Sequence, residues 1–432
     1  MRLSLWLTAL VALAATVLAL AAAWALLNPA GPPLAEASFS LDRLTPNADG
    51  QADVTIVRYR LRRPATVSIY FLDAAGARFD FRREKPRPAG ENEVWFSGIV
   101  DPFRRPGDTF TGDILARVLP DGAYTWVIEA RDADGLGNQV TGALTVAEAD
   151  TALPELSNLT VSPRLFTPNQ DGLDDRVTIN LGLSKTVGPG GLRLTLTPAD
   201  GSGVALPLAE SASSLKQPGE AGLHTYDYDG GIDLGQEPPP DGDYVVTALA
   251  EDRLGQKTLI TSTLTLARGG LPRAEIYLGE VEFSATEAVI IGQTLYFTLT
   301  VANYGTAPIR TTGPAPGFVY DSMRVNYNTI GHYVEAGAFR VGLMCETCAS
   351  DYPWRWAIGR PEDLTLIPDA QGRPQYYLLP GRRALVTGGV TLDEVVPARN
   401  PQYIWAGLIH EEVEIAAVNN RVDPRFIKIE QP

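Results

Sequence analysis

Two stretches of the chain nearly repeat each other: TPNADGQADVT at residues 45–55 and TPNQDGLDDRVT at residues 167–178. A second pair follows in the same order, PDGAYTWVIEA at residues 120–130 and PDGDYVVTALA at residues 240–250. The first pair is offset by 122 residues, Asn47 to Asn169, and the second by 120, Asp121 to Asp241. Two landmarks in the same order and at nearly the same spacing indicate an internal duplication over residues 38–268.

Apolar residues alternate with polar ones inside each copy. Val67, Ile69 and Phe71 show this in the first copy, and the second copy shows it at Leu192, Leu194 and Leu196. Alternation bounded by Gly, Pro, Asp and Asn is typical of half-buried strands. About seven such strands in roughly 110 residues is the number found in an immunoglobulin-like (Ig-like) sandwich.

A third landmark lies between the other two, as Trp95-Phe96-Ser97-Gly98 in the first copy and Tyr228-Asp229-Gly230 in the second. Together with the PN-x-DG opening and the PDG-x-Y close, it resembles the Ig-like module of flagellar hook-assembly proteins and of many bacterial surface and secreted proteins. The resemblance covers about half the chain and implies two Ig-like modules, at residues 38–149 and 150–268. Such modules act as spacers and adhesive units in unrelated proteins, so the resemblance implies a fold and no particular activity.

The remaining residues, 269–432, follow a Gly-Gly-Leu-Pro linker and again show strand alternation, for example at Leu295, Phe297 and Leu299. A strand ending in Asn303-Tyr304-Gly305 and a later Leu-Pro-Gly turn loosely resemble bacterial adhesion-type sandwich domains. Residues 311–378 are expected to be a large insert that such domains lack. The predicted fold class is therefore all-β, with three tandem Ig-like or β-sandwich domains after an N-terminal transmembrane or signal helix.

Residues 1–37 are predicted to be a membrane anchor or a signal peptide followed by a Pro-rich spacer. The run Leu3–Leu27 is 25 residues long and uncharged, whereas a helix needs ~20 residues to cross a bilayer. This favours a retained anchor in the membrane, with the rest of the protein outside the cytoplasm. The alternative is secretion after cleavage near Ala37, since Ala35-Glu36-Ala37 has the small-x-small form of a cleavage site.

Composition and motifs exclude several classes of function. The net charge of −15 repels phosphate backbones, so nucleic acid is not expected as a partner. The sequence His410-Glu411-Glu412-Val413-Glu414 lacks the second His of a zinc-protease motif, and no nucleophile elbow or phosphate-binding loop is present. We therefore expect that the protein is not an enzyme.

The two cysteines, Cys345 and Cys348, form a C-x-x-C pair without a second pair or a following His. This spacing does not complete a zinc site or a haem attachment motif. In an exported protein it predicts a local disulfide, with free thiols as the alternative.

The repeated acidic loops are the part of the sequence that most resembles a metal site. Their oxygen-bearing residues are Asn47, Asp49 and Asp53 in the first copy, and Asn169, Asp171, Asp174 and Asp175 in the second. Such side chains at alternate positions before a Gly suit Ca²⁺, but Thr45 and Thr167 stand where the first Asp of a calcium loop is expected. The favoured interpretation is an Asx-type turn. Structural Ca²⁺ is the alternative, and no other cofactor is expected.

Two further segments have an unusual composition. Residues 82–105 carry six basic side chains: Arg82, Arg83, Lys85, Arg87, Arg104 and Arg105. We expect these to lie on a solvated loop, with contact to lipid headgroups or to an acidic neighbour as the alternative. Tyr352, Trp354, Arg355 and Trp356 follow the cysteine pair, and their expected role is to pack under the insert. The alternative is a recognition surface for a glycan or a protein.

These observations predict a non-catalytic bacterial cell-envelope protein with a structural or interaction role, in which Ig-like spacers display a C-terminal binding domain. A glycan-binding surface module and an accessory subunit of a larger membrane complex are the alternatives. The expected partners are the membrane, through Leu3–Leu27, and an unidentified envelope protein or glycan.

Overall fold

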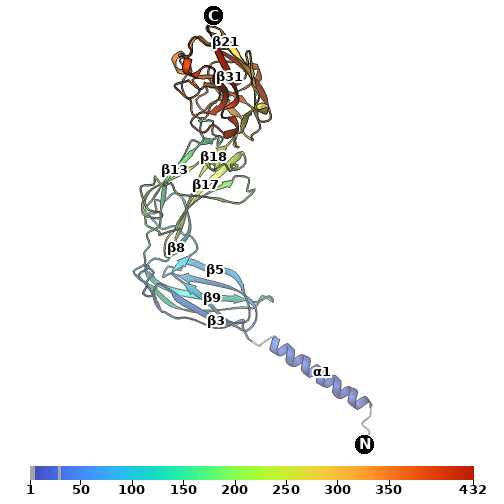
Figure 1. The fold of residues 1–432 in the computed structure, drawn as a ribbon. Coiled ribbons are helices and arrows are strands. Elements are labelled where there is room, and N and C mark those ends of the chain that lie inside the picture. Colours follow the sequence, from blue (N-terminus) through green and yellow to red (C-terminus); the bar gives the residue numbers. More distant parts are fainter. Residues whose placement is uncertain (1–4, 28–30) are drawn as a thin grey trace.

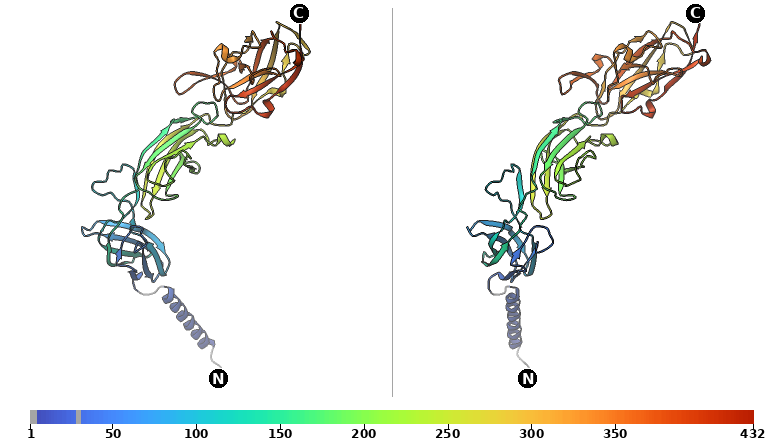
Figure 2. Two further views of the ribbon diagram at one scale, coloured as in Figure 1. Left: turned by 60° about the vertical axis from the view of Figure 1, so that its left-hand side comes forward. Right: turned by 90° about the vertical axis from the view of Figure 1, so that its left-hand side faces the viewer.

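The computed structural model describes residues 5–27 and 31–432, and most of the regular secondary structure in these residues is β-strand, which confirms the predicted all-β class. Figure 1 shows helix α1 (Leu5–Leu27) and then β-bodies that follow one another in chain order. Both views in Figure 2 show the same row, in which the chain does not fold back on itself. We call the three bodies module 1, module 2 and the C-terminal module.

Helix α1 (Leu5–Leu27) is made almost entirely of apolar residues and has no acidic residue in its first turn and no basic residue in its last. Several of its side chains are exposed, for example Trp6 and Leu18. In the described ranges, no helix combines the length and hydropathy that crossing a membrane requires, so the predicted transmembrane helix is not supported. The predicted run begins at Leu3, and both Leu3 and the start of the spacer at Asn28 lie outside the described residues.

Module 1 is a sandwich of a three-stranded sheet, in the order β1-β3-β6, and a five-stranded sheet, in the order β2-β10-β9-β4-β5. Its strands are β1 (Leu34–Phe39), β2 (Arg43–Leu44), β3 (Thr55–Leu61), β4 (Ala65–Leu72), β5 (Arg78–Arg87), β6 (Gly90–Phe96), β9 (Gly122–Arg131) and β10 (Gly137–Val146). The alternation of apolar residues turns one face of each strand inward, as at Val57, Tyr59 and Leu61 of β3. The rings of Phe71 and Phe96 stack between the sheets, with their centroids 4.5 Å apart.

Module 2 repeats this plan, with sheets ordered β11-β13-β16 and β15-β14-β17-β18. Its elements are β11 (Leu156–Ser162), β12 (Leu165–Phe166), β13 (Val177–Leu183), β14 (Leu192–Pro198), β15 (Leu206–Leu208), β16 (Gly222–Tyr228), the 3-10 helix η1 (Ile232–Leu234), β17 (Gly242–Glu251) and β18 (Lys257–Leu266). The PDG-x-Y landmark has one structural role in both modules. The Tyr124 hydroxyl donates to the Pro120 carbonyl (2.8 Å), and the Tyr244 hydroxyl donates to the Pro240 carbonyl (2.6 Å). This is the tyrosine corner of Ig-like sandwiches.

A hairpin from the first repeat crosses over to module 2. Its strands are β7 (Ile99–Val100) and β8 (Asp113–Val118), and β8 pairs antiparallel with β18, so that it extends the module 2 sheet. Phe110 and Ile114 are buried in the hydrophobic core of module 2. We call residues 97–119 the clamp, because this segment of the first repeat packs into the second.

The basic residues do not form the solvated loop that their composition predicted, because they lie on strand β5 and in the clamp. Arg82 to Arg87 lie on strand β5, at the edge of the five-stranded sheet. Arg104 is part of the clamp and donates to the carbonyl oxygens of Phe110 and Gly112, both at 2.7 Å. Arg104 therefore orders the clamp through bonds within the protein.

The C-terminal module is a larger sandwich. One sheet has the order β19-β22-β29-β24, and the other has the order β21-β31-β30-β25-β23-β28-β27. Strand β20 also pairs with β22, and β26 pairs with β25. The strands are β19 (Ala274–Ile276), β20 (Glu282–Phe283), β21 (Ala288–Ile290), β22 (Thr294–Asn303), β23 (Ile309–Thr311), β24 (Val319–Tyr320), β25 (Phe339–Cys345), β26 (Trp354–Ala357), β27 (Thr365–Pro368), β28 (Pro374–Leu378), β29 (Arg383–Thr391), β30 (Gln402–His410) and β31 (Val422–Glu430). The short 3-10 helices are η2 (Tyr277–Gly279), η3 (Tyr327–Ile330), η4 (Pro361–Asp363), η5 (Pro397–Arg399) and η6 (Ala417–Asn419).

Residues 311–378 are not an insert added to a finished sandwich. They supply β25, which lies between β30 and β23 in the middle of the larger sheet. Val341 and Leu343 of β25 are buried in the core of the module. Removal of this segment would therefore remove a central strand, and the segment is an integral part of the fold.

Candidate functional site

The first acidic loop is a turn held together by its own side chains. Asn47 Oδ1 accepts a hydrogen bond from the Asp49 amide (3.0 Å), and Asp49 Oδ1 accepts one from the Gln51 amide (2.8 Å). The Asp53 carboxylate accepts from the amides of Asn47 (3.0 Å) and Gly50 (2.6 Å). These are the bonds that an Asx-type turn requires.

The second loop repeats the pattern bond for bond. Asn169 Oδ1 accepts from the Asp171 amide (3.0 Å), and Asp171 Oδ1 accepts from the Leu173 amide (2.8 Å). The Asp175 carboxylate accepts from the amides of Asn169 (3.1 Å) and Gly172 (2.6 Å). The identical pattern explains why these residues recur at the same positions.

Asp174 contributes to the second turn through its backbone, since its carbonyl accepts from the Thr167 amide (2.9 Å). In the described part of the chain, no group of three or more His, Cys, Asp or Glu side chains is arranged to hold a metal ion. The alternative that these loops bind Ca²⁺ stays a prediction.

The second turn is buried against the C-terminal module, with Asp171 only 2% exposed. The Tyr377 hydroxyl donates to Asp171 Oδ2 (2.7 Å), and Arg310 Nε donates to the Asp171 carbonyl (2.7 Å). His410 Nε2 lies 2.8 Å from the Gln170 carbonyl, so in the neutral ring this nitrogen carries the proton and donates. The turn is thus a docking element between two modules.

Two glycines allow the backbones to approach closely at this joint. A Cβ on Gly172 would lie 2.0 Å from the Ala336 carbonyl oxygen, and a Cβ on Gly337 would lie 2.1 Å from the Asp171 carbonyl carbon. Both glycines also have positive φ, at 82° and 76°. Any side chain at either position would separate the two modules.

Burial at the joint shifts the acid–base properties of its side chains. Burial raises the pKa of Asp171, and burial together with the neighbouring Asp171 charge raises the pKa of Asp175 to about 6. Burial lowers the pKa of His410 to about 4, which favours its neutral form. In the more exposed first turn, amide hydrogen bonds outweigh burial, so the pKa of Asp53 is lowered.

The first turn faces the next module in the same way, although less tightly. Asn47 and Ala48 line a pocket of about 270 Å³ together with Lys185, Asp252 and Arg253 of module 2. Lys185 Nζ is 2.7 Å from the Asp252 carboxylate, which is almost completely buried. Both copies of the turn therefore lie at the junction with the module that follows.

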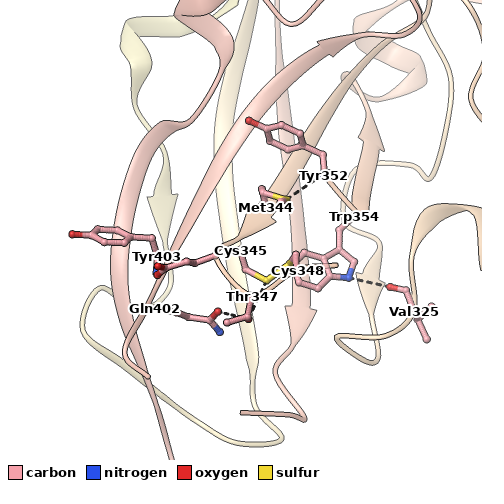
Figure 3. Close-up of a disulfide and its surroundings, with 10 residues drawn as sticks. Val325, Met344, Cys345, Thr347, Cys348, Tyr352, Trp354, Gln402 and Tyr403 are labelled. Carbon is pink, nitrogen blue, oxygen red and sulfur yellow. Dashed lines mark hydrogen bonds between the residues drawn. A yellow bond between two sulfur atoms is a disulfide. The ribbon is translucent and has the colours of Figure 1, made fainter. Parts of the chain in front are cut away.

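Cys345 and Cys348 are bonded as a disulfide at the end of β25, with their Cα atoms 5.1 Å apart. Figure 3 shows the disulfide beside Trp354, whose Nε1 donates to the Val325 carbonyl (3.0 Å). In the same view, Tyr403 points away from the disulfide. The bridge closes the tight turn that leads from β25 towards Tyr352.

The aromatic residues that follow the disulfide are in the interior. Tyr352 and Trp354 are each 1% exposed, and Trp356 is 0% exposed. Trp356 Nε1 donates to the Phe318 carbonyl (2.9 Å), and its ring packs edge-on against Phe297 with centroids 4.8 Å apart. The structure therefore places these rings in packing positions, and they do not form the alternative recognition surface.

Arg355, between the two tryptophans on β26, is also buried, and it is 8% exposed. Its Nη1 lies 2.7 and 2.6 Å from the two carboxylate oxygens of Glu411. Glu411 also contacts Arg340 (3.3 Å), and the Tyr327 ring lies 4.5 Å from the Arg355 guanidinium. This buried network uses the charge of Arg355 inside the module, so Arg355 is not a surface anchor.

Other aromatic residues of the C-terminal module are exposed. Tyr403 is 39% and Phe426 is 51% exposed, on the outer face of neighbouring strands β30 and β31. The sequence carried a signal for them, since Tyr403 and Trp405 alternate with buried Ile404 and Ala406. The adjacency of Tyr403 and Phe426 depends on strand pairing, which alternation does not give.

No protein-family model matches this chain, and no curated protein matches it. Similar solved structures include a Ca²⁺-stabilized adhesin that helps an Antarctic bacterium reach out and bind ice; the identity is 12%, the match covers 89% of this chain and 85% of that chain, and the TM-score is 0.22. The tetra-tandem repeat in the extending region of a large adhesion protein is 14% identical, with 86% and 80% covered and a TM-score of 0.17. A 1.5-MDa bacterial ice-binding adhesin is 11% identical, with 84% and 98% covered and a TM-score of 0.17. These neighbours are β-domains of bacterial adhesins, and their TM-scores are low.

Proposed function

We propose that this protein is a non-catalytic, structural or adhesion-like component of a bacterial cell envelope. Modules 1 and 2 form a stiff spacer that holds the C-terminal module at a distance from the N-terminal helix. The observation that carries the proposal is that neither joint between modules is a free linker. Each joint contains an element of one module that is packed into the next.

The joint between modules 1 and 2 is continuous β-sheet. Strand β8 is hydrogen-bonded to β18, and Phe110 and Ile114 are in the module 2 core. Rotation of one module against the other would break these bonds and expose both side chains to water. Exposure of a fully buried large apolar side chain costs about 1.5–3 kcal/mol, so bending at this joint is opposed.

The joint between module 2 and the C-terminal module is polar and closely packed. Opening it would remove the partners of the Asp171 carbonyl, the Asp171 carboxylate and the Gln170 carbonyl. A polar group that loses its partner while it stays buried costs about 1–3 kcal/mol, whereas water would replace the bonds of a fully opened joint. A bend that breaks these bonds while their groups stay buried is therefore opposed.

A location outside the cytoplasm is part of the proposal and rests on the uncharged run Leu3–Leu27. We use the word rod for modules 1 and 2 together with the C-terminal module. In the same proposal, the rod extends from a membrane or from another envelope component. N-terminal sequencing of the protein from its native cells distinguishes a retained segment from cleavage near Ala37. A protein that keeps its N-terminus and fractionates with cytoplasmic proteins would contradict the location.

The rod is tested by negative-stain electron microscopy of the full chain, with the angle at each joint measured on many particles. We expect a narrow distribution of angles at both joints. Asp171→Ala should broaden the distribution at the second joint, because it removes the acceptor of Tyr377. Asp49→Ala is the matched control, since Asp49 is the equivalent residue of the first turn and is exposed. A wide spread of angles in the unmodified protein would refute the spacer role.

A further inference from the structure

The outer face of strands β30 and β31 carries a row of aromatic side chains. The rings of Tyr403 and Phe426 lie 4.8 Å apart at 42° to each other. The Arg421 guanidinium lies 4.8 Å from the Trp405 ring and 5.7 Å from the Tyr403 ring. We call these four residues the aromatic strip.

The buried Tyr352 holds one end of the strip in place. Its ring lies over Gly342 and Gly407 of the same sheet, where a Cβ would come within 2.9 and 2.5 Å of the ring system. Its hydroxyl accepts from the Arg421 amide (3.1 Å) and donates to Asn420 Oδ1 (2.8 Å). The backbone that carries Arg421 is therefore held in place before any ligand binds, which reduces the entropy lost on binding.

The exposed apolar area of the strip is small. An aromatic side chain offers roughly 200 Å², so exposures of 39% for Tyr403 and 51% for Phe426 leave about 180 Å² between them. A stable protein–protein interface buries about 800 Å² on each partner. The exposed area of these two rings is far smaller than a whole protein interface, and it matches one or two six-membered rings.

An ion pair lies beside the strip. Glu346 is paired with Arg399 (3.0 Å). The Glu346 amide donates to the Tyr403 carbonyl (3.0 Å), which places this pair beside the strip. A ligand that fits such a site has an apolar face for the rings and hydrogen-bonding groups at its edge.

We propose that the aromatic strip binds the pyranose rings of a polysaccharide. One face of a pyranose ring presents C–H groups, which pack on an aromatic ring, and its hydroxyls extend outward at the edge. In this arrangement Tyr403 and Phe426 stack with the sugar, and Arg421 and the neighbouring Glu346–Arg399 pair bond its hydroxyls. The proposal rests on the proposed function, because it gives the C-terminal module at the end of the spacer a ligand of defined chemistry.

The test uses the full chain on an array of defined glycans that includes cellohexaose, chitohexaose, galacturonate oligomers and peptidoglycan fragments. We expect binding to at least one of them, followed by calorimetry with that oligosaccharide. Tyr403→Ala and Phe426→Ala should each weaken binding about tenfold or more, as truncation of an aromatic anchor does. Tyr296→Ala should leave it unchanged, because Tyr296 is 52% exposed on β22, in the other sheet.

Three outcomes would overturn the proposal: no binding to any glycan on the array, glycan binding that both variants leave unchanged, or loss in the variants of binding to a protein partner alone. Thermal unfolding of each variant shows whether its fold is intact, and the exposure of both side chains predicts that it is. Joint angles measured by electron microscopy on the same variants report on the spacer separately. Failure of the glycan proposal is therefore distinguishable from failure of the rod.

Discussion

Asp53 and Asp175 occupy the same position in two copies of one turn, yet their pKa values are shifted in opposite directions. Both carboxylates accept amide hydrogen bonds, which favour the charged form. Asp175 is also enclosed at a joint beside the buried Asp171, and burial and like charge oppose ionisation. The local sequence determines the hydrogen bonds of each turn, and the neighbouring module determines how deeply the turn is buried.

This difference predicts opposite dependences of stability on pH. The pKa of Asp175 is about 6 in the folded state and 3.8 in the unfolded state, so between these values the folded state binds more protons. Its contribution to stability therefore falls as pH rises through that window. Asp175→Asn should lose less stability than the wild type between pH 4.5 and 7 in urea unfolding.

Asp53→Asn is the control for that experiment. The folded-state pKa of Asp53 is lowered from 3.8, so its contribution is present above 3.8 and is lost as pH falls through the folded value. Between pH 4.5 and 7 this variant should show the slope of the wild type. His410 titrates in every protein compared, so its effect cancels. Equal slopes for the wild type and Asp175→Asn would contradict the burial of Asp175 at the joint.

The buried tryptophans give a second prediction at this scale. Trp354→Ala and Trp356→Ala should each lower the free energy of unfolding of the C-terminal module by about 3–5 kcal/mol, because each leaves a cavity. Trp95→Ala should change the stability by about 0.5 kcal/mol or less, since Trp95 is 67% exposed. Chemical denaturation, with hydrogen exchange as the readout, measures the stability of all three variants. Small effects at both buried positions would show that these rings do not pack in the core.

Among the elements, strand β8 has the most unexpected role, because it belongs to one repeat and completes the sheet of the other. Phe110→Ala should therefore destabilise module 2, by about 3–5 kcal/mol, although the residue lies in the sequence of module 1. The expected readout is faster amide exchange along β18. Leu115→Ala is the control, since Leu115 is on β8 but 40% exposed. Faster exchange confined to module 1 would contradict the clamp.

The acidic turns can be tested as elements by removing calcium. Their side-chain oxygens already accept amide hydrogen bonds, so the turn interpretation predicts that EDTA leaves the unfolding temperature of modules 1 and 2 unchanged. If Ca²⁺ were bound to the native state, chelation would lower that temperature through mass action. A decrease that is reversed by added Ca²⁺ would establish calcium sites at these turns.

The same elements show what the sequence could predict. The Asx turns and the tyrosine corners are bonded within six residues, so their landmarks are visible in the chain. Strand alternation likewise predicted the all-β class. The pairing of β8 with β18 joins residues about 140 positions apart, such as Ala116 and Lys257, and no local pattern encodes it.

For the whole molecule, the exposure of a side chain depends on which modules and strands meet. The favoured expectation from the sequence was that Tyr352, Trp354 and Trp356 pack in the interior, and strand pairing places them there. It then brought Tyr403 and Phe426 together on the surface, from strands that a long turn separates. Composition predicted that the C-terminal module is rich in aromatic residues, and only the packed structure distinguishes core from surface.

The coupling of the modules into one rod depends strongly on Arg310. This side chain is 4% exposed, and it donates to the Asp171 carbonyl and the Ala336 carbonyl, each at 2.7 Å. Arg310→Ala would leave two acceptors without this donor at a closed joint, at a cost of about 1–3 kcal/mol for each acceptor that stays buried.

We expect calorimetry of the full chain to show module 2 and the C-terminal module unfolding in one coupled transition. In Arg310→Ala, two separate transitions are expected at lower temperature. Arg373→Ala is the matched control, because Arg373 is 66% exposed in its ion pair with Asp369 and exposed pairs contribute about 1 kcal/mol or less. Identical transitions in Arg310→Ala and the wild type would mean that the modules unfold independently and that the joint does not couple them.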